Sequence, residues 1–535
     1  MRIGLALVAA LALAAAVPPA WFLGAEFLVF LGLGAFYAVT RTSRRPLLAA
    51  YLMGMGYMLA FSWSLRHVLW AGYVAIGFVG AVYFLVAAAW TRALSRVICG
   101  PIAFGCAAAA TFWMRAEMPE IPYPHGQPIH DFHRWPAVLG CVALGGEPAG
   151  NFLLAALSAA CVDLWGSWRV AMPSWRAAWT TLSAVLSTGL VLTVAASSSF
   201  ALSESKQEGG DGQEHALDVA VLEPGFAALF QHKTSAAEAV LERLIRPTEV
   251  VAGPGVSRPP ALVVWPESCY RARARESGAS VFLDPAPLRI DLAPETSLLA
   301  GAEMQRADGR MSAVALLLDS AGVVQGWHEK TKVVPAGERI PFLTSLPVRW
   351  RDALLTWVEA TMGQVPDLEP GRVRAPLSVP VRAPDQPSRR VRIGPLICFE
   401  NAFPSVVRAH VQAGAQLLVV LSNEAWYRGG AELDQLEAMT VMRCIESRTP
   451  AIRCTVDGHT VAFGPDGRCL GRIESGASLE RAKVLRLRIP LGQGRLPPLA
   501  WLAELVLWLI LASPLLLARH VLGSWARVLL TRPQR

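Results

Sequence analysis

Charged residues are scarce in this chain of 535 residues: Asp, Glu, Lys and Arg make up 17% of it, against roughly a quarter in an ordinary soluble domain. No GxGxxG or P-loop pattern occurs, which excludes the common nucleotide sites, and no CxxC pair or His/Cys spacing suits zinc. No basic run with interleaved aromatic residues occurs either, so the net charge of +8 does not indicate nucleic-acid binding. Hydrophobic residues instead reach 53% and the mean hydropathy is +0.38, which predicts a protein partly embedded in lipid.

Long apolar runs are concentrated in residues 1–200, and each is long enough to cross the roughly 30 Å hydrocarbon core of a bilayer. We predict membrane helices near 4–20, 22–40, 47–63, 68–90, 94–114, 136–164 and 177–197, with one more near 498–518. The first run has a basic start and a small-residue end, so it could instead be a cleaved signal peptide. Because the next apolar run follows at once and leaves no soluble N-terminus, we favour a retained helix.

Arginines flank these runs on one side of the predicted membrane: Arg2, Arg41, Arg44, Arg45, Arg92, Arg96, Arg169, Arg176, Arg519, Arg527, Arg532 and Arg535. Basic residues mark cytoplasmic loops, so both termini are predicted to be cytoplasmic and residues 205–495 to face outward. The opposite loop, 115–135, contains "HGQPIHDFH". We expect it to be solvated, although its three histidines and Asp131 leave a metal site as the alternative.

The composition changes after residue 200. We predict a membrane domain of about seven helices over 1–200, a polar linker over 201–215, an α/β domain over 216–495, and a last membrane helix with a basic tail over 496–535. Short β-branched or Leu-rich runs predict buried strands at "ALDVAVLEP", "ALVVWPES", "SAVALLLD", "VRIGPLICFE" and "QLLVVLSNEAW". Helical spacing at 234–246 and 432–447 predicts helices on the outside of the sheets. Periodicity alone does not give the order of the strands.

Three of these stretches deliver ionisable residues at the end of an apolar strand. "VVWPES" supplies Glu267, "GWHEKTKVVPAGE" supplies Lys330 and Glu338, and "LICFE" supplies Cys398 and Glu400. A carboxylate base, an ammonium and a thiol form a set suited to acyl transfer. The thiol needs a base because its ordinary pKa is about 8.5, and the lysine's charge would favour the thiolate and stabilise an oxyanion.

Each residue taken alone has a simpler explanation. Glu267 could cap a strand end, Lys330 could be a solvated lysine like Lys332, and Cys398 could be an inert buried thiol. Inert thiols are what we expect of the cysteines in the apolar runs, Cys99, Cys106, Cys141 and Cys161. The joint occurrence of the three residues, each at a strand end, favours a site.

The motifs "WPES", "KTKVVPAGERIPF", "ICFENAFP", "SNEAWY" and "MRCIESRTPAIRCTVDG" resemble the nitrilase superfamily and, more narrowly, the apolipoprotein N-acyltransferase family. The resemblance covers essentially the whole chain. It implies a multi-pass α-helical membrane region and a nitrilase-like α-β-β-α sandwich, held in a bacterial inner membrane with the sandwich in the periplasm. It also implies that Glu267 is the general base, Lys330 the stabilising cation and Cys398 the nucleophile, with Glu338, Phe399 and Glu400 in support.

The reaction implied by this resemblance moves an acyl chain from a phospholipid to Cys398 as a thioester, and then to the α-amino group of a diacylated apolipoprotein. We expect no cofactor, no metal and a monomer. A membrane-anchored amidase, or a transferase with another acceptor, would keep the same three residues and stays open. A catalytically silent binding protein is also conceivable, but the intact Glu267, Lys330 and Cys398 argue against it.

Several positions depart from the family pattern. Phe399 replaces a Tyr, Glu424 an Asp, and Leu436 the His that commonly follows Gln435, while "LEPG" at 222–225 replaces Gln-Gly-Asn. These departures predict a divergent branch with altered substrate handling. Five cysteines lie in the domain predicted to face an oxidising compartment, where a disulfide could form: Cys269, Cys398, Cys444, Cys454 and Cys469.

Overall fold

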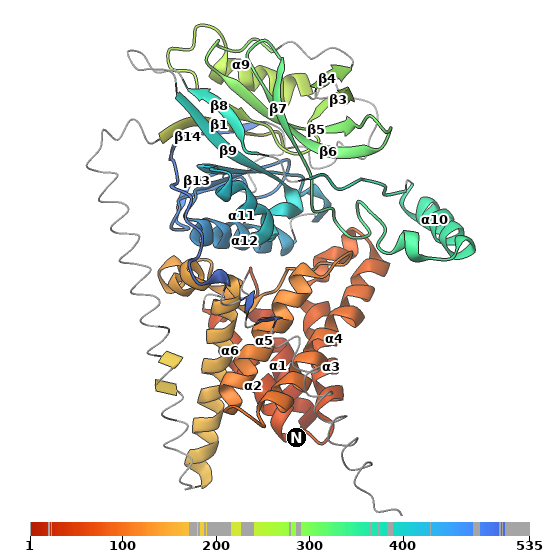
Figure 1. Cartoon of the computed structure of the whole chain (residues 1–535), viewed down its shortest axis with the longest axis vertical. Coiled ribbons are helices and arrows are strands. Elements are labelled where there is room, and N and C mark those ends of the chain that lie inside the picture. Colours follow the sequence, from red (N-terminus) through yellow and green to blue (C-terminus); the bar gives the residue numbers. More distant parts are fainter. Residues whose placement is uncertain are drawn as a thin grey trace, which may run out of the picture.

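A helical bundle and a two-sheet domain are stacked end to end in the computed structural model (Figure 1). The residues that the structure describes are 2–19, 22, 24–170, 179, 182–183, 185–186, 189, 216–225, 240–277, 280–284, 290–363, 365–372, 375–381, 389–427, 430–473, 482–501, 504–505 and 507–508. The predicted helices at 177–197 and 498–518, the linker at 201–215 and the basic tail therefore lie almost entirely outside the described residues.

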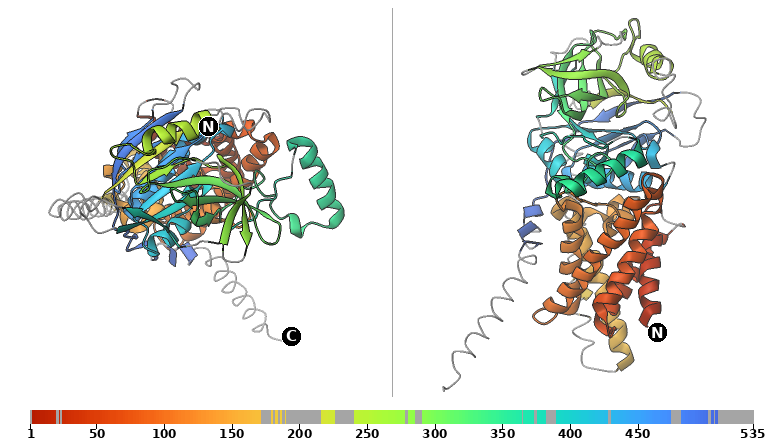
Figure 2. Two further views of the ribbon diagram at one scale, coloured as in Figure 1. Left: turned by 90° about the horizontal axis from the view of Figure 1, so that it is seen from above. Right: turned by 90° about the vertical axis from the view of Figure 1, so that its right-hand side faces the viewer.

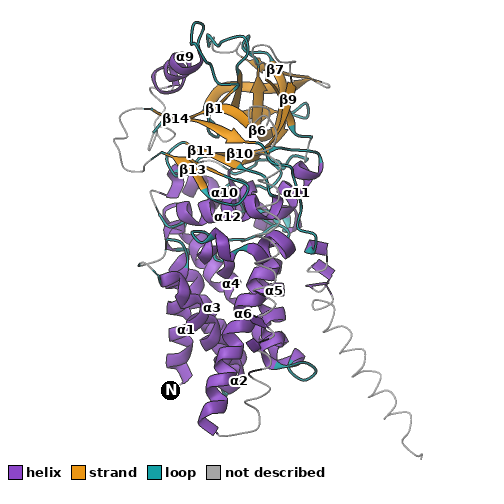
Figure 3. Cartoon of the chain, turned by 90° about the vertical axis from the view of Figure 1, so that its left-hand side faces the viewer, coloured by secondary structure: helices purple, strands orange, loops and turns teal. Residues whose placement is uncertain are grey.

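The bundle is wholly helical, and the strands are confined to the other end of the molecule (Figure 3). Its long helices are α1 Arg2–Ala16, α2 Leu28–Thr42, α3 Pro46–Phe61, α4 Trp70–Leu94, α5 Gly100–Glu117 and α6 Gly140–Val170. Short 3-10 helices join them: η1 Ala25–Phe27, η2 Trp63–His67, η3 Pro128–Phe132 and η4 Pro136–Val138. Prolines at the first turns of α3 and α5 begin these helices at positions where no intrahelical N–H is needed.

Three described segments are long and apolar enough to cross a membrane: Ala25–Thr42, Trp70–Leu94 and Gly140–Gly166. Gly4–Ala16 and Pro46–Phe61 are shorter apolar helices. The predicted runs from 4–20 to 136–164 thus all coincide with helices, and length and apolar character identify a membrane protein.

Two sheets form the second domain. The first has the order β14-β1-β2-β5-β3-β4, with β6 and β7 added beside β5, and the second has the order β13-β12-β11-β10-β9-β8. Their strands are β1 Ala216–Glu223, β2 Leu262–Val264, β3 Tyr270–Ser277, β4 Ser280–Asp284, β5 Ser297–Gln305, β6 Met311–Leu318, β7 Val324–Glu329, β8 Leu377–Val381, β9 Arg389–Ile397, β10 Leu417–Ser422, β11 Ala451–Thr455, β12 Val461–Phe463, β13 Cys469–Arg472 and β14 Lys483–Pro490. Each predicted strand is present.

Helices cover the outer face of each sheet, which gives four layers (Figure 1). The π-helical turn η5 Leu241–Ile245 and α9 Arg246–Ala252 lie on the first sheet, and α11 Pro404–Gln412 and α12 Glu432–Ser447 lie on the second. Along β10, alternate side chains enter the core between the sheets and the core under α11 and α12, so both faces are buried. The predicted α-β-β-α sandwich is confirmed, as is the helix at 432–447.

The sandwich rests on the bundle through α12. One apolar core includes Met439 and Met442 of α12 together with Phe61, Phe112 and Ile129 of the bundle side. The remaining helix, α10 Val348–Met362, projects sideways from the junction in Figure 1 and in the left view of Figure 2. Short 3-10 helices complete the domain: η6 Leu343–Ser345, η7 Cys398–Ala402 and η8 Ala425–Tyr427.

The expectation of a solvated loop at 125–133 is wrong. His125, His130, Asp131 and His133 are all buried, because the sandwich covers this loop from the other side of the junction. His130 Nε2 lies 2.7 Å from Glu147 Oε1. The polar residues of the loop predicted exposure to solvent. The prediction failed because a sequence does not show which domain will cover a loop.

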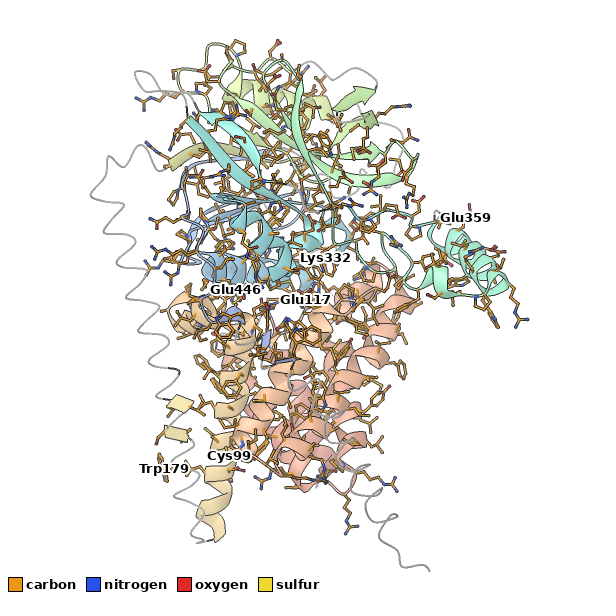
Figure 4. The ribbon with its side chains drawn as sticks, in the orientation of Figure 1. Cys99, Glu117, Trp179, Lys332, Glu359 and Glu446 are labelled. Carbon is orange, nitrogen blue, oxygen red and sulfur yellow. The ribbon has the colours of Figure 1, made fainter. Side chains whose placement is uncertain are left out.

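A buried ion cluster joins the two domains at the same place. Helix α6 breaks at Gly146, whose φ is 72°, and the freed amide of Glu147 donates to Glu446 Oε1 at 2.8 Å. Arg443 pairs with Glu147 and with Glu446, the latter at 3.1 Å. Figure 4 shows Glu446 at this junction, near Glu117 and Lys332, whose Nζ lies 3.5 Å from Glu117 Oε2.

Candidate active site

The ends of three strands bring the predicted residues together. Glu267 follows β2, Lys330 follows β7 and Cys398 follows β9. Strands β2 and β7 belong to the first sheet and β9 to the second, so the site forms where the two sheets face each other. Close packing of the sheets is therefore what assembles it.

Lys330 lies between two carboxylates. Its Nζ is 2.9 Å from Glu267 Oε1 and 2.6 Å from Glu338 Oε1, and its side chain is 1% exposed. Burial alone would lower the pKa of Lys330, but the two carboxylates reverse this and raise it well above its ordinary value. The lysine is thus a permanent buried cation.

The carboxylate of Glu267 is held at both oxygens. Its Oε2 accepts the Asn423 amide at 3.0 Å, while Oε1 faces Lys330. Burial raises the pKa of Glu267, and the Lys330 charge opposes that rise. Gly301 on β5 makes room for this turn, because a Cβ there would lie 2.5 Å from the Glu267 Cα. The result is a fixed carboxylate that is more basic than a solvated one.

Cys398 occupies a strained turn. Its φ is 49°, in the left-handed region that side chains other than glycine rarely adopt. Burial raises the pKa of its thiol to about 12, with the Glu267 and Glu338 charges adding to the rise and Lys330 opposing it. Lys330 lowers the pKa of the thiol, as expected from the sequence, but burial and the two carboxylates raise it by more. The thiol is therefore protonated at neutral pH.

Glu400 holds this turn rather than facing Lys330. Its side chain accepts hydrogen bonds from the Ile397 amide at 2.8 Å and from the amide and hydroxyl of Thr331, both at 2.6 Å. His328 Nε2 lies 3.0 Å from the same carboxylate. Burial would raise the pKa of Glu400, but His328 and the donors lower it to about 2. Glu400 consequently ties the Cys398 turn to the residue that follows Lys330.

Phe399 faces the bundle. Its ring stacks on His125 with centroids 6.0 Å apart, and His125 stacks on Tyr123 at 4.9 Å, which in turn stacks on Phe61 of α3 at 6.1 Å. Phe403 meets the Phe399 ring edge-on at 5.0 Å. An aromatic column therefore connects α3 with the residue next to Cys398, and no contact in this column requires the hydroxyl of the Tyr that the family has here.

Two further departures, Glu424 and Leu436, are buried near the second sheet. Glu424 forms an ion pair with Arg453 and accepts the His459 amide at 3.3 Å. Leu436 packs in the junction core, and its carbonyl accepts Asn401 Nδ2 at 2.9 Å. Both residues thus have structural partners close to the site.

Sequence reasoning assigned no role to three residues that complete the site. Thr331 and His328 hold Glu400, and the Asn423 amide holds Glu267. Thr331 and Asn423 stand inside the quoted motifs "KTKVVPAGERIPF" and "SNEAWY", which was the available signal. The structure describes all nine cysteines and joins none of them in the disulfide considered from composition.

Two cavities lie between the bundle and the sandwich. One, of about 490 Å³, is lined by α1, α3 and η2 on the bundle side and by Tyr427 and the start of α12 on the other. The second, of about 510 Å³, is lined by α5, α6, α11 and residues 496–508.

Known families match both domains. Residues 9–160 match the family described as "Apolipoprotein N-acyltransferase N-terminal domain", and residues 286–491 match "Carbon-nitrogen hydrolase". Among curated proteins, the apolipoprotein N-acyltransferase of Geobacter metallireducens is 33% identical over 274 residues, covering 50% of this chain and 45% of its own. That of Caulobacter vibrioides is 28% identical over 284 residues, covering 51% and 49%. The chain thus spans about half the length of these relatives.

Solved structures resemble only part of the chain. A nitrilase-superfamily protein of Saccharomyces cerevisiae is 12% identical, with a TM-score of 0.32 over 52% of this chain and 90% of its own. An amidase of Nesterenkonia sp. is 16% identical, with a TM-score of 0.29 over 52% and 91%. The bundle is thus similar to the N-terminal domain of apolipoprotein N-acyltransferases, and most of the sandwich is similar to carbon-nitrogen hydrolases.

Proposed function

We propose that this protein is an N-acyltransferase that moves an acyl chain from a phospholipid, through a thioester on Cys398, to the N-terminal amino group of a diacylated apolipoprotein. The observation that carries the proposal is the buried Glu267–Lys330 pair, whose charges act on Cys398 at the face of the sandwich that rests on an apolar bundle. Curated relatives over half the chain are named apolipoprotein N-acyltransferases.

In the first half-reaction, the Cys398 sulfur attacks the ester carbonyl of the phospholipid. Because the thiol is protonated at rest, Glu267 accepts its proton as the C–S bond forms. The negative charge on the carbonyl oxygen is stabilised by Lys330, which its two carboxylate neighbours keep charged. When the intermediate collapses, the lysophospholipid alcohol leaves with the proton from Glu267, and the acyl chain remains on sulfur.

In the second half-reaction, the neutral amine of the acceptor attacks the thioester carbonyl. Glu267 takes a proton from the attacking nitrogen, Lys330 again stabilises the oxyanion, and the Cys398 sulfur leaves. The sulfur then recovers a proton from Glu267. The products are an amide and the free thiol, so the enzyme is unchanged after one cycle.

The placement of the site suits two lipid substrates. Exposing an acyl chain to water costs about 0.8 kcal/mol of free energy per CH₂. A site against the bundle can receive the chain from the bilayer without that cost. Helix α10 beside the junction exposes Trp350 and Trp357, as residues at a membrane surface commonly do.

The charge pattern supports an inner-membrane protein with a periplasmic sandwich. Arg45, Arg92 and Arg96 line one cavity together. Figure 4 shows Cys99, three residues after Arg96, near the end of the bundle remote from the sheets. Basic residues at that end favour its cytoplasmic location.

The test is to incubate the purified protein with phospholipid alone and look by mass spectrometry for a hydroxylamine-sensitive acyl adduct, then to add a diacylated lipopeptide. We expect the adduct on Cys398 and its transfer to the peptide amine. Cys398→Ala and Cys398→Ser should abolish both, since a serine alkoxide is harder to form and its ester is a poorer donor.

Cys269→Ala is the matched control. This buried cysteine lies two residues after Glu267, and its loss should cost only packing, about 1–2 kcal/mol. An adduct that persists in Cys398→Ala, or that sits on Cys269, would refute the assignment. An adduct that passes only to water or to another amine would instead favour the amidase or the alternative transferase.

A further inference from the structure

Gln435, whose Oε1 is buried without a partner among the described residues, lines the cavity of about 490 Å³ described above. Phe61, Trp63 and Arg66 line it from the bundle side, and Tyr427, Ala431 and Gln435 line it from the sandwich. Glu432, the first residue of α12, stands between the last two of these residues. The sequence predicted no functional role for Glu432.

Glu432 is 0% exposed, yet among the residues that the structure describes no other residue donates a hydrogen bond to its carboxylate, whose one nearby donor is its own backbone amide. Oε1 of Gln435, which is 1% exposed, likewise receives no hydrogen bond from a described residue, although its Nε2 donates to the Phe61 carbonyl at 3.4 Å. Buried acceptors are paired in the great majority of cases, and each exception needs an explanation. The three oxygens together indicate a missing donor.

Three donors near Glu432 and Gln435 are already used by other groups. The hydroxyls of Tyr123 and Ser62 are 2.7 Å apart and bond each other. The Arg66 guanidinium lies over the Trp63 ring at 4.1 Å and donates to the Trp63 carbonyl at 2.8 Å. A ligand with N–H groups would supply donors that these three side chains do not.

Tyr427, a residue of the cavity wall, lies near both Cys398 and Glu432. Burial raises the pKa of Tyr427, and Cys398 and Glu432 add to the rise when they are ionised. A group bound next to Glu432 would therefore lie on the side of the site that includes Cys398.

We propose that Glu432 and Gln435 bind a primary ammonium group of a substrate in this cavity. An ammonium carries three N–H donors and no acceptor, which matches three unpaired acceptor oxygens. This assignment rests on the proposed function, whose substrates offer two primary ammonium groups: the α-amino group of the acceptor peptide and the ethanolamine headgroup of a phospholipid donor.

The titratable groups around Glu432 are consistent with a cation-binding role for this residue. Burial raises the pKa of Glu432 to about 8, and Arg66 opposes the rise. The other titratable groups that act across this enclosure are Tyr123 and Tyr427, which are neutral when protonated. The empty site therefore favours a neutral carboxyl, and an entering ammonium favours its ionisation with release of one proton.

The first arm measures binding in the Cys398→Ala background, which forms no thioester. A diacylated lipopeptide with a free α-amine is compared with its N-acetylated form. We expect the free amine to bind about tenfold more tightly, the effect of one charge-assisted hydrogen bond. Glu432→Gln should remove this preference. Asp434→Asn, two residues along α12 and paired with Arg134 at 3.7 Å, should keep it.

The second arm keeps Cys398 and compares acyl-adduct rates on vesicles of phosphatidylethanolamine and of phosphatidylglycerol. If the headgroup is the source, the wild type prefers the amine-bearing lipid and Glu432→Gln loses that preference; if the peptide is the source, only the first arm changes. The proposal is overturned if Glu432→Gln retains the wild-type behaviour in both arms, or slows both lipids equally while leaving peptide binding unchanged. Failure of the wild type to form any adduct would refute the proposed function alone, because the binding arm needs no turnover.

Discussion

Replacing Glu400 by Gln tests how much the Cys398 turn depends on a buried charge. Four hydrogen-bond contacts converge on this carboxylate, and they lower its pKa from an ordinary 4.5 to about 2. Since one pKa unit corresponds to about 1.4 kcal/mol, the folded protein favours the charged form by about 3 kcal/mol. Glu400→Gln removes that charge and places an NH₂ group against donors, so we expect it to lose about this much stability.

The pH dependence separates this mechanism from simple loss of packing. A carboxyl whose pKa is lowered on folding stabilises the protein above its unfolded pKa of about 4.5, and this contribution is lost as the pH falls toward 2. Denaturant unfolding in detergent should therefore show a gap of about 3 kcal/mol between wild type and Glu400→Gln at pH 6 that shrinks below pH 4.5.

The control for this comparison is Glu369→Gln. Glu369 is a partly exposed carboxylate paired with Arg339 at 3.2 Å, and its loss should cost less than about 1 kcal/mol. A gap for Glu400→Gln below about 1 kcal/mol, or one that does not change with pH, would refute the reasoning.

Three further predictions follow from the site and the junction. Lys330→Ala should remain folded but form no acyl adduct by mass spectrometry; an adduct at the wild-type rate would show that the oxyanion does not need this cation. The adduct rate should fall as the pH decreases, with a midpoint above 4.5, because protonation of Glu267 removes the base and burial raises its pKa; a flat profile from pH 4 to 8 would exclude that role. Arg443→Met leaves Glu147 and Glu446 buried without their cation, so thermal unfolding should show a loss of about 3–5 kcal/mol. Arg408→Met, which removes a one-third exposed pair with Glu504, should cost under about 1 kcal/mol, and equal losses would contradict the comparison.

Local patterns were sufficient to predict most elements of this protein. Strand β10 is predictable because burial on both faces leaves a short continuous apolar run, and α12 is predictable because its apolar residues recur at helical spacing. Glu267, Lys330 and Cys398 could be proposed together because each follows a strand, and strand ends are where sheets expose functional side chains. The structure brings Glu267, Lys330 and Glu338 into direct contact.

Other features depend on which surfaces meet, and no local pattern reports that. The loop at 125–133 looked solvated, yet the sandwich buries it and makes His125 part of the column that reaches Phe399. Glu400 appeared to be one more carboxylate of the site, but its partners are His328 and Thr331.

The sequence by itself determined that one part of the chain is surrounded by lipid and the other by water, the class of each domain, and the residue types available for acyl transfer. Composition and periodicity are properties of neighbours along the chain, so a sequence reports them directly. Tertiary structure alone decided that the Cys398 thiol is protonated at rest, since burial and the Glu267 charge outweigh Lys330. It alone also buried the oxygens of Glu432 and Gln435 without partners from other described residues, and placed Gln435 in the wall of a cavity. Desolvation and hydrogen-bond satisfaction depend on everything packed around a group, and most of those atoms come from distant parts of the sequence.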